Sequence, residues 1–185
     1  MRKILIVIDM QNDFIDGSLG TPEAVAIVEN VKAKIREYDP ADICFTQDTH
    51  ETNYLQTQEG RNLPVEHCIR GTKGWEIRED IRALVKDCEE EPQPGGAAVR
   101  PVFEKPTFGS VELAETLREL LQEEELEIEI VGLCTDICVV SNALLLKAYM
   151  PEVKITVDSS CCAGVTPASH EAALETMKMC QINVI

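Results

Sequence analysis

The sequence has little positive charge and few aromatic residues. It contains 17 lysines and arginines against 33 acidic residues, which gives a formal net charge of -16 at pH 7. Nucleic acids and anionic membranes bind proteins through basic patches, so we expect neither as a partner. Aromatic residues make up 4% of the chain. Any ligand pocket is therefore expected to be lined mainly by aliphatic side chains.

Long apolar runs and paired cysteine motifs are also missing. No apolar run approaches the roughly 18 residues of a membrane span, and the first one, residues 4–8, is too short for a signal peptide. We therefore expect a cytoplasmic protein. The eight cysteines include no Cys-X-X-Cys pair, which argues against a zinc ribbon or a thioredoxin-like motif. Most of them lie in apolar runs, which favours reduced thiols over a disulfide framework.

What the chain does contain is an alternation of short β-rich runs with longer amphipathic segments. Strands are predicted at residues 3–9, 43–46, 102–105, 128–133, 153–157 and 182–185. Helices are predicted at 21–38, 76–87, 111–124, 136–148 and 166–179, and a turn at 93–96. This pattern predicts one α/β domain spanning residues 1–185, a doubly wound, mainly parallel sheet of about six strands flanked by helices in three Rossmann-like layers.

Four groups of reactive side chains lie at or just beyond the ends of predicted strands. They are Asp9, the polar segment 48–67, Lys105 and the segment 134–138. Ligands of doubly wound sheets bind at the carboxyl ends of the strands, so the topology is expected to bring these groups to one edge. The polar stretch 47–74 is too long for a simple connection, and loops of this length usually carry function.

Cys138 lies in the first turn of a predicted helix, with Thr135 as a candidate N-cap. The positive end of the helix dipole favours the thiolate form of a cysteine there. The alternative is a small buried hydrophobic residue, since free cysteines are often buried. Asp9 closes an apolar run, where a carboxylate must be paired or must cap a turn. Pro106 keeps Lys105 extended, although most lysines are simply surface residues.

The chain has only three histidines: His50, His67 and His170. His170 belongs to the last amphipathic helix and is most simply a residue on its face. Asp48 and His50 are two residues apart, so in an extended chain both point to the same side. His67 could return to them from the far end of the long loop. Two histidines and a carboxylate are suitable ligands for zinc, iron or manganese, although an Asp-X-His pair alone is a weak signal.

Five segments together resemble one family. They are VIDMQNDF (7–14), TQDTH (46–50), PVEHC (64–68), KPTFGS (105–110) and VGLCTDICV (131–139). In this order they are similar to the isochorismatase-like cysteine hydrolases over essentially the whole chain, and within that family to the nicotinamidases. The resemblance implies a catalytic triad of Asp9, Lys105 and Cys138. It also implies a cis peptide bond before Cys134, with the backbone amides of Cys134 and Cys138 forming an oxyanion hole.

The resemblance further implies a divalent metal, with zinc favoured over iron or manganese. Its ligands would be Asp48, His50 and His67. Some nicotinamidases add a glutamate nine residues after the first histidine, which corresponds here to Glu59, although the loop spacing on its other side differs by one residue. If both histidines are ligands, no histidine remains near Cys138, and Asp9 and Lys105 must activate the thiol.

The implied activity is hydrolysis of nicotinamide to nicotinate and ammonia through a cysteine thioester, with a role in NAD salvage. Two places where nicotinamidases often carry aromatic residues hold Leu63 and Ile137, which leaves Phe14 and Phe108 as candidate walls for the substrate. The expected partners are a small amide and further copies of the chain in a homo-oligomer. The alternatives are an amidase for ureidoacrylate or an N-carbamoyl compound, a non-catalytic metal-binding scaffold and, less favoured, the isochorismatase vinyl-ether reaction or a thiol-redox protein.

Overall fold

The centre of the molecule is a parallel sheet of six strands. The structure is a computed structural model that describes residues 1–85 and 102–185. Its strands are β1 (Arg2–Ile8), β2 (Ile43–Asp48), β3 (Val102–Lys105), β4 (Leu126–Leu133), β5 (Lys154–Ala163) and β6 (Asn183–Val184). They lie in the order β3-β2-β1-β4-β5-β6, and every neighbouring pair is parallel. This confirms the predicted α/β fold. The predicted turn at 93–96 and the last two residues of the predicted helix 76–87 lie outside the described residues.

The strand order reverses between β1 and β4. From β1 the chain adds β2 and β3 on one side, and it then crosses over to add β4, β5 and β6 on the other. In open α/β sheets such a reversal leaves a crevice beyond the carboxyl ends of the two central strands. Asp9 follows β1 directly, and Cys134 follows β4. Two of the predicted functional segments therefore begin at this reversal.

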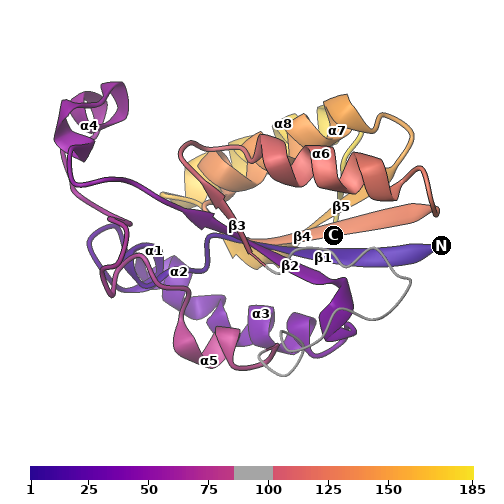
Figure 1. Cartoon of the computed structure of the whole chain (residues 1–185), viewed down its shortest axis with the longest axis horizontal. Coiled ribbons are helices and arrows are strands. Elements are labelled where there is room, and N and C mark those ends of the chain that lie inside the picture. The colour runs from indigo at the N-terminus through magenta and orange to yellow at the C-terminus, as the bar shows by residue number, and fades with distance from the viewer. Residues whose placement is uncertain (86–101) are drawn as a thin grey trace.

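Helices cover both faces of the sheet (Figure 1). On one face lie α1 (Asn12–Ile15), α2 (Pro22–Ala26), α3 (Val28–Ile35) and α5 (Glu79–Arg82). On the other lie α6 (Val111–Leu120), α7 (Val140–Tyr149) and α8 (Pro167–Met179). The short helix α4 (Gln58–Asn62) belongs to neither layer, because it lies beyond the carboxyl ends of the strands (Figure 1). In the described part of the chain, the 3₁₀ turns are η1 (Pro40–Asp42) and η2 (Tyr54–Gln56).

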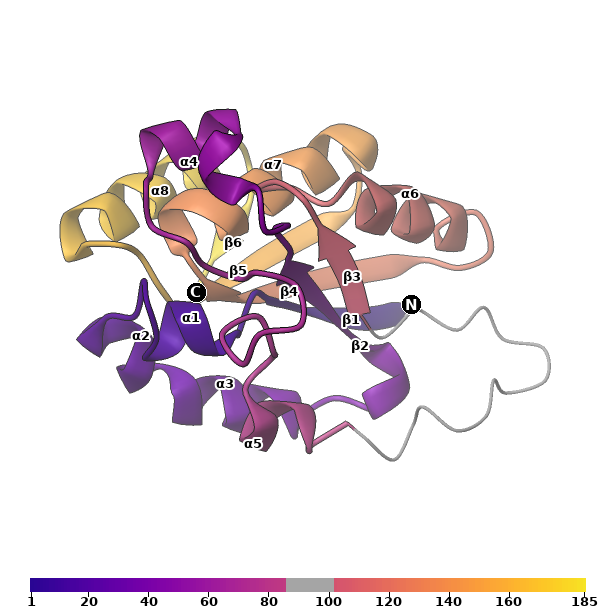
Figure 2. The same cartoon turned by 60° about the vertical axis from the view of Figure 1, so that its left-hand side comes forward.

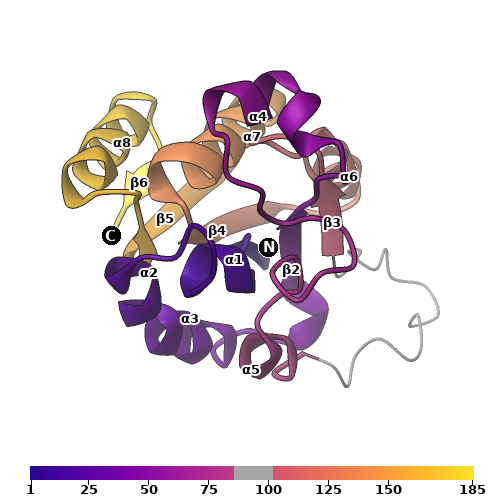
Figure 3. The same cartoon turned by 90° about the vertical axis from the view of Figure 1, so that its left-hand side faces the viewer.

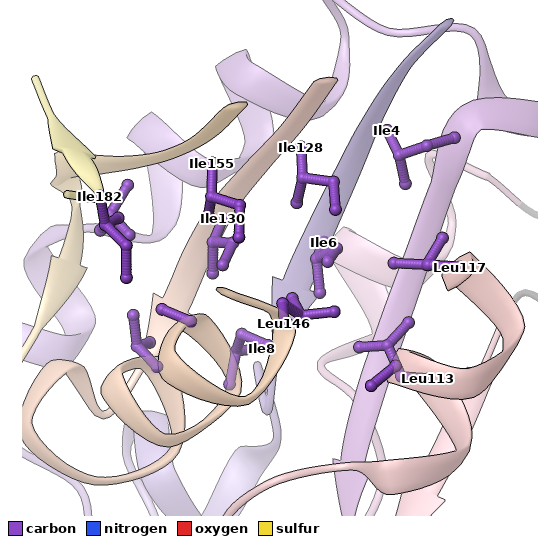
Figure 4. Packing of buried hydrophobic residues seen from close by; sticks show 14 of the residues in the cluster. Ile4, Ile6, Ile8, Leu113, Leu117, Ile128, Ile130, Leu146, Ile155 and Ile182 are labelled. Atoms are coloured by element: carbon purple, nitrogen blue, oxygen red, sulfur yellow. The ribbon is translucent and has the colours of Figure 1, made fainter. Parts of the chain in front are cut away.

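The near-continuous apolar sequence of β1 reflects burial on both faces. Ile4, Ile6 and Ile8 pack against α6, α7 and α8, in the cluster that Figure 4 shows with Leu113, Leu117 and Leu146. Leu5 and Val7 point the other way, into the cluster that includes residues of α3 and α5. Successive side chains of a strand point to opposite faces, so a strand between two helical layers needs apolar residues at every position.

Close packing of β1 against β4 depends on Gly132. This residue has a φ of +118°, and a Cβ placed on it would lie 2.1 Å from the carbonyl oxygen of Ile8. Both the conformation and the contact exclude a side chain. The glycine therefore allows the two central strands to approach where their functional residues begin.

Several helices differ from the sequence predictions. The predicted helix 21–38 begins as expected, with the Thr21 hydroxyl accepting from the Ala24 amide, but breaks at Ile27 into α2 and α3. Within the described part of the predicted helix 76–87, only α5 forms. The predicted helix 136–148 starts with a wide π-helical turn, η4 (Thr135–Val139), before α7. Among the described residues, no helix combines the length and the apolar character that crossing a membrane requires.

Candidate functional site

The carboxylate of Asp9 is fixed at the end of β1 by Thr46 on β2. Asp9 has a φ of +44° and is fully buried. Its amide donates to the carbonyl oxygen and the hydroxyl of Thr46, at 3.3 and 3.2 Å. The Thr46 hydroxyl in turn donates to Asp9 Oδ1 at 2.6 Å. Thr46 escaped the sequence analysis because only the pairing of β1 with β2 reveals its partner.

Lys105 connects three reactive groups. It is the last residue of β3, and 1% of it is exposed. Its ammonium lies 2.7 Å from Asp9 Oδ2, 3.2 Å from Asp48 Oδ1 and 3.4 Å from Cys138 Sγ. Burial lowers the pKa of Lys105, but the negative groups around it, Asp9 first, outweigh burial and raise the pKa well above its usual value. Lys105 is therefore charged, and the predicted triad residues lie together.

The surroundings of Cys138 raise the pKa of its thiol. Cys138 is the fourth residue of η4 and is 4% exposed. Burial and the negative charge of Asp9 raise its pKa well above the usual value, and the Lys105 ammonium opposes them only in part. The sequence analysis expected the helix dipole to favour the thiolate, whereas burial and Asp9 act on the pKa in the opposite direction. Burial also raises the pKa of Asp9, which makes it a better proton acceptor.

The turn that carries Cys138 begins with a cis peptide bond and is held by hydrogen bonds that the sequence analysis did not predict. The peptide bond between Leu133 and Cys134 is cis, as the family resemblance implied. Cys134, not Thr135, is the N-cap of η4, and its carbonyl oxygen accepts from the amides of Ile137 and Val139 at 3.1 and 3.0 Å. The Thr135 hydroxyl instead bonds with His170.

His170 is on the predicted helix, but it is more than a residue of the helix face. From α8, its Nδ1 lies 2.8 Å from the Thr135 hydroxyl. In the same region the carboxylate of Asp136 accepts from the backbone amide of Val165 at 3.1 Å. The start of α8 and the loop before it therefore support the turn that carries Cys138. A side-chain contact between such distant segments leaves no periodic signal in the sequence.

The long loop returns alongside β2 and so brings His67 to His50. The amide of His50 donates to the carbonyl oxygen of Cys68 at 3.0 Å, and the amide of Arg70 donates to the carbonyl oxygen of His50 at 2.8 Å. The Cys68 amide also donates to Asp13 Oδ2 at 2.8 Å. Figures 2 and 3 show this loop and α4 at the carboxyl end of the sheet.

The candidate metal ligands converge as predicted. Asp48, His50 and His67 are buried, and their ligand atoms all lie within 4.8 Å of one another. His50 Nε2 is 3.1 Å and His67 Nε2 is 3.7 Å from Asp48 Oδ2. Glu59, on α4, reaches the same point, with its Oε1 3.5 Å from His50 Nε2 and 3.8 Å from His67 Nε2. Two imidazoles and two carboxylates surround one position.

These donors fit a divalent cation. His50 Nε2 is buried and has no hydrogen-bond partner of acceptable geometry among the described residues. His67 Nδ1 contacts the Val65 carbonyl at 2.8 Å, an arrangement that fixes the ring and leaves Nε2 for a ligand. Burial lowers the pKa of His50, but Asp48 and Glu59 raise it to about 9 overall, so the site favours positive charge. Two imidazoles with carboxylates suit zinc, iron or manganese.

The side chain of Gln11 forms hydrogen bonds with both the backbone amide and the backbone carbonyl of Asp48. Its Oε1 accepts from the Asp48 amide and its Nε2 donates to the Asp48 carbonyl oxygen, both at 2.8 Å. The same Nε2 donates to the carbonyl oxygen of Trp75 at 2.7 Å. Gln11 is fully buried. Gln11 therefore positions a candidate ligand and connects the segment after β1 to Trp75, which follows the long loop.

Aromatic rings pack around the candidate metal position. The Tyr54 ring lies 4.6 Å from the His50 ring and 5.0 Å from the His67 ring, measured between centroids. Phe14, a predicted wall of the substrate site, lies 5.5 Å from the His67 ring. Phe108, the other predicted wall, lies on the loop after β3 and is 43% exposed, so its role stays a prediction. The sequence analysis missed Tyr54, although it lies in the loop already identified as functional.

Comparison with known proteins agrees with this fold and site. The Isochorismatase domain model matches residues 3–185, and the chain belongs to this family. It is 30% identical over 181 residues to the uncharacterized isochorismatase family protein PncA of Bacillus subtilis (strain 168), covering 94% of this chain and 93% of that protein.

Two solved structures are similar over the full chain. The crystal structure of nicotinamidase/pyrazinamidase PncA from Bacillus subtilis has a TM-score of 0.79 and 28% identity, covering 100% of this chain and 99% of that one. The structure of pyrazinamidase from Pyrococcus horikoshii in complex with zinc has a TM-score of 0.75 and 26% identity, with the same coverage.

Proposed function

We propose that this protein is an amidohydrolase that converts nicotinamide to nicotinate and ammonia through a thioester on Cys138. The observation that carries the proposal is the buried cluster in which the Lys105 ammonium lies 2.7 Å from Asp9 Oδ2 and 3.4 Å from Cys138 Sγ. Membership of the isochorismatase family and the likeness to a nicotinamidase/pyrazinamidase support the same function. A small amide is the partner that this chemistry requires.

In the proposed reaction Asp9 is the base and Cys138 the nucleophile. Because burial and Asp9 keep the thiol protonated at rest, the proton moves to Asp9 only as sulfur attacks the amide carbon. Lys105 remains beside the sulfur and balances the negative charge that passes through the site. Asp9 then gives its proton to the departing ammonia. Asp9 next deprotonates a water molecule that attacks the thioester carbon, the carbon–sulfur bond breaks to release the acid, and Asp9 returns its proton to the Cys138 sulfur.

The oxyanion formed in both steps would be stabilised by the backbone amides of Cys134 and Cys138. Loss of one such donor typically slows an enzyme by ~10²–10³-fold. The hydrogen bonds to the Cys134 carbonyl and the Thr135 hydroxyl keep this turn in place before substrate arrives. A rigid turn of this kind avoids reorganisation during the reaction.

A divalent cation held by Asp48, His50, His67 and Glu59 completes the proposal, with zinc as the preferred ion. When bound, it would supply a Lewis-acidic centre that holds the pyridine nitrogen of the substrate. Phe14 lies beside this position and offers an apolar wall to the ring. The wider proposal is a cytoplasmic homo-oligomer that returns nicotinamide to NAD salvage.

The decisive experiment measures ammonia release from nicotinamide, pyrazinamide, ureidoacrylate and N-carbamoyl compounds, with and without a chelator. We expect turnover of nicotinamide that falls when the cation is removed. Turnover of a carbamoyl compound without turnover of nicotinamide would identify a different amidase of the family. A metal-loaded protein that releases ammonia from none of these compounds would contradict the hydrolase proposal.

A further inference from the structure

The side chain of Asn142 connects the two segments that carry Lys105 and Cys138. It lies on α7, one turn after Cys138, and is fully buried. Its Oδ1 accepts from the Ser110 amide at 2.9 Å. Its Nδ2 donates to the carbonyl oxygens of Phe108 at 3.0 Å and of Cys138 at 2.8 Å. Each of these three bonds is made to a backbone group.

Asn142 is a polar side chain among apolar neighbours. The neighbouring residues Val139, Ala143 and Leu146 of the same helical segment all belong to the apolar core. An amide buried among apolar side chains costs free energy unless its polar atoms are paired, and a hydrophobic residue would serve packing alone equally well. The partners of Asn142 are therefore the informative feature. They belong to the loop after Lys105 and to the turn of the nucleophile.

The loop held by Asn142 is short and has little freedom of its own. Only residues 106–109 separate Lys105 from Ser110, which caps α6 by accepting from the Leu113 amide at 3.2 Å. Gly109 packs on α7, where a Cβ would lie 3.4 Å from a methyl carbon of Leu145. A shift of this loop relative to α7 would therefore be transmitted to Lys105.

We infer that Asn142 is a positioning residue, which sets the contact between the Lys105 ammonium and the Cys138 sulfur by fixing the 106–110 loop to the turn of the nucleophile. The inference rests on the proposed amidase function for its kinetic consequences, but its geometric basis is independent of the substrate. Asn142 touches none of the reacting atoms. It acts through the relative placement of the two residues at 3.4 Å.

The test compares two substitutions at position 142 with a control on the same helix. Asn142→Leu has a similar size and removes all three bonds. Asn142→Thr can still bond to the carbonyl four residues earlier in its own helix but cannot reach the loop. The control is Leu146→Ala, one turn further along α7, where Leu146 points into the apolar core (Figure 4). No residue of the 106–110 loop is a member of that core cluster.

For both variants at position 142 we expect kcat for nicotinamide to fall about 10- to 100-fold, because small misplacements of catalytic groups cost that much. KM and bound metal should stay within about twofold of the wild type, since the substrate and metal contacts are unchanged. Leu146→Ala should lower the Tm at least as much and keep its kcat. A folded Asn142→Thr protein with the kcat of the wild type would overturn the inference. If Asn142→Leu does not fold, the kcat of Asn142→Thr alone tests the inference.

Alkylation of Cys138 by iodoacetamide, followed by peptide mass spectrometry, separates this inference from the proposed function. Cys138 should react more slowly in both variants than in the wild type, because its cation is displaced, while Leu146→Ala should match the wild type. If the wild type does not hydrolyse nicotinamide, the proposed function fails and this rate still tests the inference. An alkylation rate equal to or above that of the wild type would contradict it.

Discussion

One carboxylate oxygen of Asp48 lies 3.2 Å from the ammonium of Lys105, while the other faces the candidate ligand histidines. The same ammonium pairs with Asp9 at 2.7 Å. Burial raises the pKa of Asp48, but His50 and Lys105 outweigh it, so the pKa is lowered and Asp48 stays ionised. The buried ammonium of Lys105 therefore pairs with both Asp9 and Asp48. It connects the candidate metal centre to the thiol site.

Substitution of Lys105 should damage both stability and activity. Lys105→Met leaves Asp9 and Asp48 buried without their cation, and breaking a buried ion pair in this way typically costs about 3–5 kcal/mol. We expect a loss of that size in the free energy of unfolding, measured with urea, together with loss of ammonia release. The control is Lys154→Met, which removes an exposed ion pair to Glu127 and should cost at most about 1 kcal/mol. Equal losses in the two variants would contradict the counterion role of Lys105.

Removal of the Cys138 sulfur should separate chemistry from metal binding. In Cys138→Ala, ammonia release from nicotinamide is expected to fall on the order of 10⁴-fold or more, as it does when a nucleophile is lost elsewhere. Metal content, measured by mass spectrometry of the intact holoenzyme, should be unchanged because no candidate ligand is altered. Cys180→Ala, at an exposed cysteine of the C-terminal region, should keep full activity. Retained turnover in Cys138→Ala would remove Cys138 from the mechanism.

Glu59 can be tested as the fourth ligand against a neighbour in the same loop. Glu59→Gln should lower the affinity for zinc by about 10- to 100-fold, the usual effect of weakening a group that supports a metal. Competition with a chelator measures this affinity. Glu51→Gln is the matched control, because Glu51 is exposed and pairs with Arg70 at 3.0 Å. His67→Ala should lose metal more completely than Glu59→Gln. Equal affinities in Glu59→Gln and Glu51→Gln would exclude Glu59 from the site.

Acid sensitivity should arise in part from Asp158, away from the reactive centre. Burial raises the pKa of Asp158, but hydrogen bonds from Ser160 and the charge of Lys34, 3.0 Å away, lower it overall. A carboxyl whose pKa is lower in the folded state stabilises the protein above its unfolded pKa of about 4, and this contribution is lost as the pH falls through the folded value.

Asp158→Asn should therefore reduce the free energy of unfolding at pH 7 by about 1.5–3 kcal/mol, the usual contribution of hydrogen bonds to a charged group. The difference from the wild type should shrink as the pH falls below 4. Urea unfolding followed by circular dichroism between pH 3 and 7 measures this difference. A constant difference over the whole range would show that the charge of Asp158 does not contribute.

Two glycines with positive φ separate backbone strain from steric exclusion. Gly71 has a φ of +79° and open space around it, whereas a Cβ on Gly132 meets the Ile8 carbonyl. Gly71→Ala should lower the free energy of unfolding by about 1–2 kcal/mol, because alanine disfavours a positive φ. Gly132→Ala must in addition part β1 from β4, so a much larger drop in Tm or failure to fold is expected. Similar Tm values in both variants would show that the sheet accommodates the methyl group.

The sequence predicted best those features that follow from local pattern. The apolar run before Asp9 and the short run ending at Lys105 gave strands at the correct positions, and parallel topology then placed both residues at one edge of the sheet. Asp48 and His50 were found as candidate ligands because they are two residues apart just beyond the end of a predicted strand. The residues also offered His67 as a third ligand from the far end of the long loop, and the family resemblance supplied the cis bond before Cys134.

Other features depend on packing between distant segments. Thr46, Tyr54, Asn142 and His170 act through side-chain contacts that no spacing in the sequence encodes. The local pattern around Cys138 also could not show that burial and the neighbouring Asp9 raise the pKa of its thiol, against the direction expected from the helix dipole. The break at Ile27 and the wide turn before α7 likewise interrupt segments whose pattern predicted continuous helices.

The separation of Asp9, Lys105 and Cys138 along the chain makes the site a reporter of complete assembly. The three residues follow or end β1, β3 and β4, so their contacts require strands on both sides of the crossover to be in place. A partly folded chain would keep all three residues and lose their proximity. During refolding, enzymatic activity should thus be the last signal to recover, after secondary structure and after burial of the central strands.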